Sequence, residues 1–166
     1  AIQIVILSNN RFEGRIPSPS QPHSMSLFAA NNNLFTDQLP INICAGTLDL
    51  SFNSLSGPLI LLNSSAPLPS QKILTNVLSL NLAGVGGLTC PIELGLFTSL
   101  SSLQLQGAGF SGCNFNDPTM VQLPSSLTLL DVSQNKWLPM IMTVPANLVT
   151  FRANIAGILA LQLSRP

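Results

Sequence analysis

The chain has 166 residues, of which 46% are hydrophobic and only 7% are charged, and its six basic and six acidic residues cancel. A chain of this length can bury one core, and because it contains no Tyr that core must be mostly aliphatic. The balanced charge excludes the basic surface that binding to nucleic acid or to an anionic membrane requires.

The most apolar stretch, from Val77 to Leu88, is too short for a membrane-spanning helix, which needs about 20 apolar residues, and it contains Asn81 and several glycines. The first residues, Ala1 to Leu7, lack the basic residues and the cleavage pattern of a signal peptide. We therefore expect no membrane segment in this chain.

A short motif recurs along the chain. The first copy, from Val5 to Pro17, reads VILSNNRFEGRIP, and the copy from Leu48 reads LDLSFNSLSG. The copy from Leu103 reads LQLQGAGFSG and the copy from Leu130 reads LDVSQNKW, while weaker copies complete the series. In chain order the copies begin at Val5, Phe28, Leu48, Leu80, Leu103, Leu130 and Phe151, between 20 and 32 residues apart (48 − 28 and 80 − 48).

These copies resemble the plant-type leucine-rich repeat, LxxLxxLxLxxNxLxGxIP, whose period is about 20–29 residues. Ile2 to Pro17 fits this pattern almost completely, and Pro91 to Leu100 resembles the segment that links consecutive copies. The resemblance covers essentially the whole chain. It implies a single domain over residues 1–166, an α/β-type repeat solenoid of about seven repeats, with a parallel β-sheet on its concave face and an irregular convex side.

Each copy alternates in the manner of a strand, so that Val5 and Leu7 point to one side while Ile6 and Ser8 point to the other. One such strand buries little, and stacking the copies as a parallel sheet buries a continuous aliphatic column. Four strands are followed by an asparagine that we expect to turn inward, where its amide satisfies backbone groups of the bend and stacks into a ladder: Asn10, Asn33, Asn53 and Asn135.

The other copies depart from this pattern. Val85, Ala108 and Ala156 occupy the asparagine position, so their bends must be satisfied by the backbone or by water, or else the alignment of these copies is wrong. Asp37 and Thr89 replace the glycine that follows the bend, which predicts irregular coils at these two positions.

Two long connections, residues 60–76 and 113–122, predict loops that leave the solenoid. Ile2 begins inside a repeat, and no capping segment follows Phe151. We therefore expect a fragment that lacks both caps. The alternative is a chain whose ends are covered by neighbouring molecules.

The sequence offers no catalytic constellation. His23 is the only histidine, whereas a nucleophile needs an adjacent base and a zinc site needs several ligands. We interpret His23 as a solvated loop residue, and we expect no enzyme activity, no metal site and no cofactor.

Three cysteines bear on the redox compartment. Cys90 and Cys113 each lie ten residues after the start of their copies (90 − 80 and 113 − 103), which places them at equivalent positions of adjacent coils. Such positions lie about 4.8 Å apart, within the range of a disulfide. The pair is either bridged, which favours an oxidising compartment, or reduced and buried. Cys44 would be unpaired.

Asn63-Ser64-Ser65 is an N-glycosylation sequon within the first long loop. In a secreted protein we expect a glycan on Asn63.

The outward positions of the predicted sheet are mostly small and uncharged, and they form the expected ligand-binding face. Phe52 is the aromatic residue on this face, since Trp137 is expected to face the core. The predicted contact residues are Ile6, Asn9, Asn31, Asp49, Phe52, Asn81, Gln104, Gln106, Asp131 and Arg152. For each of them an ordinary solvated sheet is the alternative interpretation.

These features predict a non-catalytic extracellular or cell-surface module that recognises a protein, peptide or polysaccharide along its concave sheet. The alternative is a structural cell-surface or matrix protein that self-associates through its open ends into a glycosylated fibre, as low charge, missing caps and few aromatics would allow. An ice-binding surface needs a flat, regular ladder, and the irregular outward positions argue against it.

Overall fold

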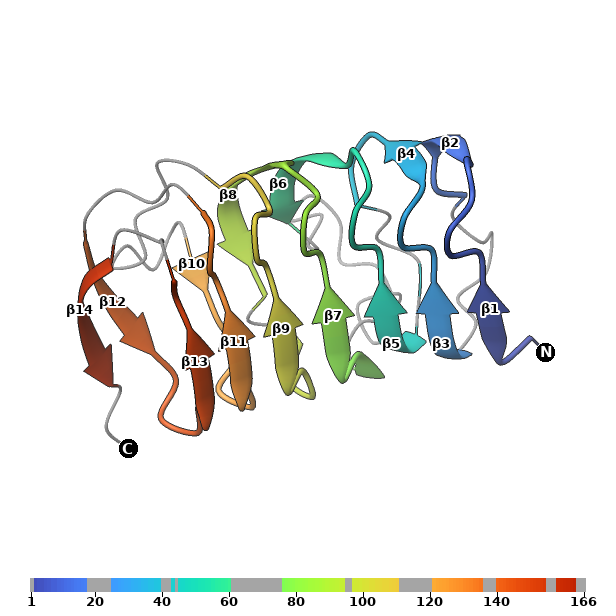
Figure 1. Ribbon diagram of the computed structural model, residues 1–166. Helices are drawn as coiled ribbons and strands as arrows, with labels where there is room; N and C mark the ends of the chain where they lie inside the picture. The colour runs from blue at the N-terminus through green and yellow to red at the C-terminus, as the bar shows by residue number, and fades with distance from the viewer. Residues whose placement is uncertain are drawn as a thin grey trace.

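The computed structural model describes residues 2–17, 25–39, 43, 45–60, 76–94, 97–110, 121–135, 140–154 and 158–163. The chain is a parallel β-solenoid, and Figure 1 shows its longest sheet facing the viewer. This long sheet contains seven strands, in the order β1 (Ile4–Ile6), β3 (Met25–Ala29), β5 (Ala45–Asp49), β7 (Ser79–Asn81), β9 (Ser102–Gln104), β11 (Leu129–Asp131) and β13 (Thr150–Arg152).

The predicted strand positions are confirmed, because the first apolar residue of every copy lies in one row across the long sheet. The row is Val5, Phe28, Leu48, Leu80, Leu103, Leu130 and Phe151, each paired in register with the next. Leu103 and Leu130 are fully buried, whereas Val5 and Phe151 at the two edges are only partly buried. Neighbouring strands thus cover each other's apolar residues, as stacking requires.

The connections between these strands carry short parallel sheets, which in Figure 1 lie above the long sheet, behind it or, at its C-terminal end, beside it. One pairs β2 (Glu13–Arg15) with β4 (Leu34–Thr36), and another pairs β12 (Met140–Val144) with β14 (Ile158–Leu163). The third has the order β10 (Val121–Gln122), β8 (Gly87–Glu93), β6 (Ser56–Ile60).

The α/β-type part of the expected fold class is wrong for the described residues, since Asn76 alone is helical there, as a single 3₁₀ residue. The segments that follow the bends alternate with period two, as at Phe12, Gly14 and Ile16, and this period favours strands.

No helix in the described part of the chain is long and apolar enough to cross a membrane.

Inward-pointing asparagines join the coils, as predicted. Asn53, which is 6% exposed, accepts a hydrogen bond from the Phe35 N–H at 3.1 Å and donates to the carbonyls of Ala30, Leu50 and Ser51 at 2.9, 3.0 and 3.3 Å. Asn33 and Asn135 make equivalent bonds. Each of these amides therefore bonds the backbone of its own bend and of the preceding coil, so the ladder runs through backbone groups and not from amide to amide.

Asn10 makes only some of the equivalent hydrogen bonds. Its amide donates to the carbonyls of Leu7 and Ser8 at 3.0 and 3.1 Å, but the residue is exposed. No described coil lies on its outer side.

The two described copies without asparagine are aligned correctly, because Val85 is 4% exposed and Ala108 is fully buried. Groups of the next coil satisfy their bends: the Gly84 N–H donates to the Gln106 carbonyl at 2.7 Å, and the Gly109 N–H donates to the side chain of Asn135, at Oδ1, at 3.1 Å. Ala156 lies outside the described residues.

The irregular coil expected at Asp37 is not observed. Asp37 has a φ of 67°, close to the 77° of Gly14 and the 91° of Gly57 at equivalent positions, and aspartate tolerates this left-handed conformation better than most residues. At Thr89 the irregularity is present, because the pairing of β6 with β8 shifts register immediately after Pro58 pairs with Thr89.

The structure does not test the expectations for His23, Cys44, Asn63, Cys113 and Trp137. These residues lie outside the described part of the chain.

Candidate functional site

The outward side chains of the long sheet form the candidate site, which we call the long-sheet face. One row runs along the C-terminal ends of the strands in continuous register: Ile6, Ala29, Asp49, Asn81, Gln104, Asp131 and Arg152. Six of the ten predicted contact residues belong to this row. The other four, Asn9, Asn31, Phe52 and Gln106, lie in the bends that follow the strands.

A second row, which we call the bend row, consists of the residue immediately before each inward position. All six described members have positive φ: Asn9 (60°), Asn32 (55°), Phe52 (52°), Gly84 (65°), Gly107 (59°) and Gln134 (58°). Glycine and asparagine adopt this conformation readily, whereas a bulky residue rarely does. Phe52 and Gln134 are the two members that are neither glycine nor asparagine, and Phe52 is the bulkier of them.

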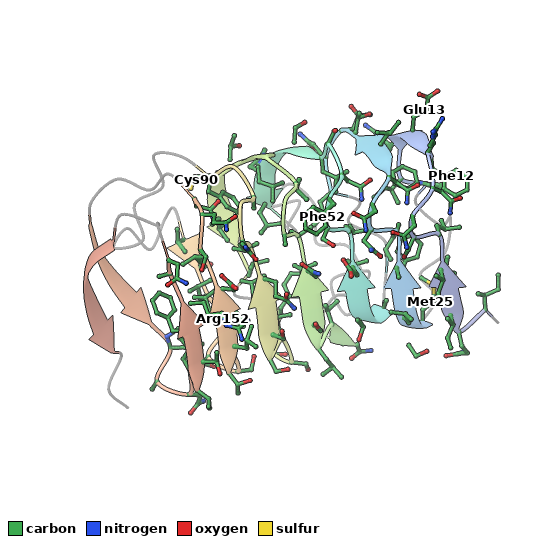
Figure 2. The ribbon with its side chains drawn as sticks, in the orientation of Figure 1. Phe12, Glu13, Met25, Phe52, Cys90 and Arg152 are labelled. Carbon is green, nitrogen blue, oxygen red and sulfur yellow. The ribbon has the colours of Figure 1, made fainter. Side chains whose placement is uncertain are left out.

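The Phe52 side chain is 57% exposed and leans onto the next coil. A Cβ placed on Gly84 would lie 2.6 Å from Cδ1 and 2.7 Å from Cε1 of the Phe52 ring. The ring thus rests on the bare backbone of Gly84, and Figure 2 shows it near the middle of the solenoid, just beyond the strands of the long sheet.

Both predicted contact carboxylates hold the backbone at strand ends. Asp49 Oδ1 accepts hydrogen bonds from the Ser51 N–H at 3.1 Å and the Ser51 hydroxyl at 2.7 Å, and Asp131 Oδ1 accepts from the Ser133 N–H at 2.9 Å. Asp131 is only 7% exposed, and its Oδ2 lies 3.8 Å from Nη1 of Arg152 on the neighbouring strand. The sequence signal for this role is an Asp-x-Ser triplet at the end of a strand.

In the N-terminal part of the long-sheet face, polar side chains form hydrogen bonds to one another. The Ser8 hydroxyl donates to Asn31 Oδ1, and Asn32 Nδ2 donates to Asn9 Oδ1 at 3.0 Å. Two predicted contact residues, Asn9 and Asn31, therefore already use part of their hydrogen-bonding capacity within the protein.

The middle of the face is more open. Gln104 and Gln106 are half-buried, and within the described residues no hydrogen bond occupies either side-chain amide. Asn81, paired with Gln104 across β7 and β9, uses Oδ1 to accept the Ala83 N–H at 3.1 Å, which leaves its NH₂ group available. We call Phe52, Asn81, Gln104 and Gln106 the central patch.

Other chemistry is limited in the described residues. They contain no group of three or more His, Cys, Asp or Glu side chains that could hold a metal ion. Cys90 is half-buried and disulfide-bonded. Because Cys44 and Cys113 both lie outside the described residues, the predicted pairing of Cys90 with Cys113 stays a prediction.

No protein-family model matches the chain, and no curated protein matches it in sequence. Among solved structures, the chain is similar to the crystal structure of a plant ice-binding protein, with 16% sequence identity and a TM-score of 0.46. The match covers 98% of this chain and 66% of that one, so the chain spans just under two thirds of that protein's length. This likeness is one of fold, and it transfers no ligand.

Proposed function

We propose that the chain is a non-catalytic, extracellular leucine-rich repeat module of the plant type, which recognises a protein, peptide or glycan through the long-sheet face. The observation that carries the proposal is the central patch: the Phe52 side chain is 57% exposed, and within the described residues no hydrogen bond occupies the side-chain amides of Gln104 and Gln106. Isolated exposed apolar residues are ordinary, but exposed aromatics beside polar groups are typical of binding surfaces.

The repeat assignment is supported by the inward asparagines and the aligned apolar row. An extracellular location is supported by the disulfide at Cys90, since disulfides persist in oxidising compartments. In that location we expect a glycan on Asn63.

A steric block tests recognition whatever the ligand class. Ser102 begins β9 and lies on the same side of that strand as Gln104 of the central patch, so Ser102→Arg should abolish binding to any ligand retained from an immobilised panel of proteins, peptides and glycans. Ser56→Arg, on the separate sheet that contains β6, is the matched control and should bind normally. Equal binding by both variants would show that the long-sheet face is not the recognition surface.

A second candidate function is end-to-end assembly into a fibre, and the exposed apolar side chains of Ile2 and Phe12 favour it. Phe12 is 45% exposed and Ile2 69%, whereas the equivalent column residue of the next coil, Phe35, is 4% exposed. A second copy stacked there would cover the Phe12 ring, which already stacks on Phe35 with centroids 6.1 Å apart. Light scattering and electron microscopy should then show filaments that Ile2→Lys or Leu161→Lys abolishes, and stable monomers would contradict this candidate.

A further inference from the structure

The residues of the central patch bear on which class of ligand the long-sheet face binds. Phe52 occupies a bend position where four of the five other described members are asparagine or glycine, residue types that tolerate a positive φ, and the fifth is Gln134. An asparagine would adopt this left-handed backbone conformation at a lower free-energy cost. The bend therefore does not account for the phenylalanine, and another role of its side chain must.

The Phe52 ring packs against the next coil, while more than half of the side chain stays exposed. One side of the ring contacts the Gly84 backbone, where no side chain intervenes, and the side chain remains 57% exposed. A flat apolar surface of this kind accepts the C–H face of a sugar ring, in the way that one aromatic ring stacks on another flat group.

The neighbouring amides supply both donors and acceptors. Gln104 and Gln106 each offer a carbonyl oxygen and an NH₂ group, and Asn81 offers its NH₂ group. Sugar hydroxyls also donate and accept, so this set is complementary to a polyhydroxylated ligand in either orientation.

The charged side chains described near the patch favour a neutral ligand. The nearby carboxylate of Asp49 is bonded to Ser51, and Arg152 lies beside Asp131. The other described arginines belong to the first coil: Arg11 precedes β2, and Arg15 is its last residue. A uronate sugar would therefore find no cation in the described part of the patch.

Peptide binding by strand addition is disfavoured here. That mode needs an open sheet edge, whereas β5, β7 and β9 are each paired on both sides. We propose that the central patch is a subsite for a neutral oligosaccharide, an inference that rests on the proposed recognition function and narrows its ligand class.

The test uses the intact chain on an array of glucose, mannose and xylose hexasaccharides, with hexagalacturonate and uncharged decapeptides as competing classes. We expect retention of at least one neutral hexasaccharide. Phe52→Asn should weaken it about tenfold, the loss expected for one aromatic stacking contact, and Gln104→Ala should weaken it further. Leu34→Asn removes an equally exposed apolar side chain from β4, outside the long sheet, and should bind like the parent chain.

Misfolding of Phe52→Asn does not confuse this test. Asparagine already occupies the same bend position at Asn9 and Asn32, with φ of 60° and 55°. The melting temperature of Phe52→Asn should therefore be no lower than that of the parent chain. Retention of only hexagalacturonate or a peptide, or unchanged affinity in Phe52→Asn, would overturn the saccharide inference. If a peptide or protein binds and Ser102→Arg blocks it, the recognition function survives while this inference fails. If Ser102→Arg blocks nothing, both fail.

Discussion

Asn53 illustrates how single residues hold the solenoid together. Its side chain makes four hydrogen bonds to backbone groups of two coils, and the residue is almost fully buried. Asn53→Ala would leave those groups unpaired away from water. We expect a loss of about 3 kcal/mol in the free energy of unfolding, measured by urea titration.

Asn10 provides the matched control for Asn53. It makes two backbone bonds from an exposed position, where water can replace the lost amide. Asn10→Ala should therefore cost less than about 1 kcal/mol. Equal losses in the two variants would show that burial of the inward amide does not determine its contribution.

Two glycines test the close approach of neighbouring coils. A Cβ on Gly109 would lie 2.1 Å from the Gly86 carbonyl oxygen, whereas a Cβ on Gly86 would meet nothing within 4 Å. Both have left-handed backbones, with φ of 86° and 77°. Gly86→Ala should cost about 1–2 kcal/mol from its backbone conformation alone.

Gly109→Ala should cost about 4 kcal/mol or more, because backbone atoms of two coils must separate. Thermal unfolding followed by circular dichroism distinguishes the two variants. Similar melting temperatures would mean that the coils are not in close contact at Gly109.

At the scale of the element, the end of β11 depends on a side-chain cap. Asp131 Oδ1 accepts the Ser133 N–H, and Asn81 Oδ1 holds the Ala83 N–H in the same way at the end of β7. We therefore expect Asp131→Asn to be nearly neutral and Asp131→Ala to lose about 1–2 kcal/mol, measured by urea titration of both variants. An equal loss in Asp131→Asn would mean that the ion pair with Arg152 is the dominant interaction, although such partly exposed pairs contribute little.

The sequence predicted the long sheet because the same strand motif recurs in order along the chain, as at Leu48, Leu80 and Leu103, although the intervals vary from 20 to 32 residues. It did not predict the short sheets such as β2 with β4, because the period-two alternation that favours them extends over only three residues in each strand and the resemblance implies an irregular convex side. It also located Asp49 and Asp131 on the outward face correctly but could not show their carboxylates turned back onto the chain, because period-two alternation gives the side of a residue and not its hydrogen bonds.

The sequence predicts where the candidate site lies, but not that Phe52 has an unusual backbone conformation within it. The face and its aromatic residue follow from the repeat, but the strain at Phe52 depends on the left-handed bend, which becomes evident only when the whole bend row is compared. The contact with Gly84 joins residues of different coils, and its geometry depends on how those coils stack.

At the scale of the whole molecule, stability should increase from the edges of the long sheet toward its middle. Among the described strands, β1 pairs only with β3, and Val5 is partly buried, whereas β9 pairs on both sides and Leu103 is fully buried. A solenoid in which each coil contacts only its neighbours frays from its ends, because an end coil opens without disturbing the others. Amide hydrogen exchange read by mass spectrometry should therefore be slowest for peptides that contain β7 and β9 and fastest for those that contain β1.

The same experiment can separate fraying from global opening. Because the inward amide of Asn53 bonds the coils that contain β3 and β5, Asn53→Ala should speed exchange most in those two strands. Its effect on β9 and β11 should be smaller, since Asn135 still joins their coils through the carbonyls of Leu105 and Val132. Uniform acceleration along the sheet would instead mean that the solenoid unfolds as one cooperative unit, with no end coil able to open by itself.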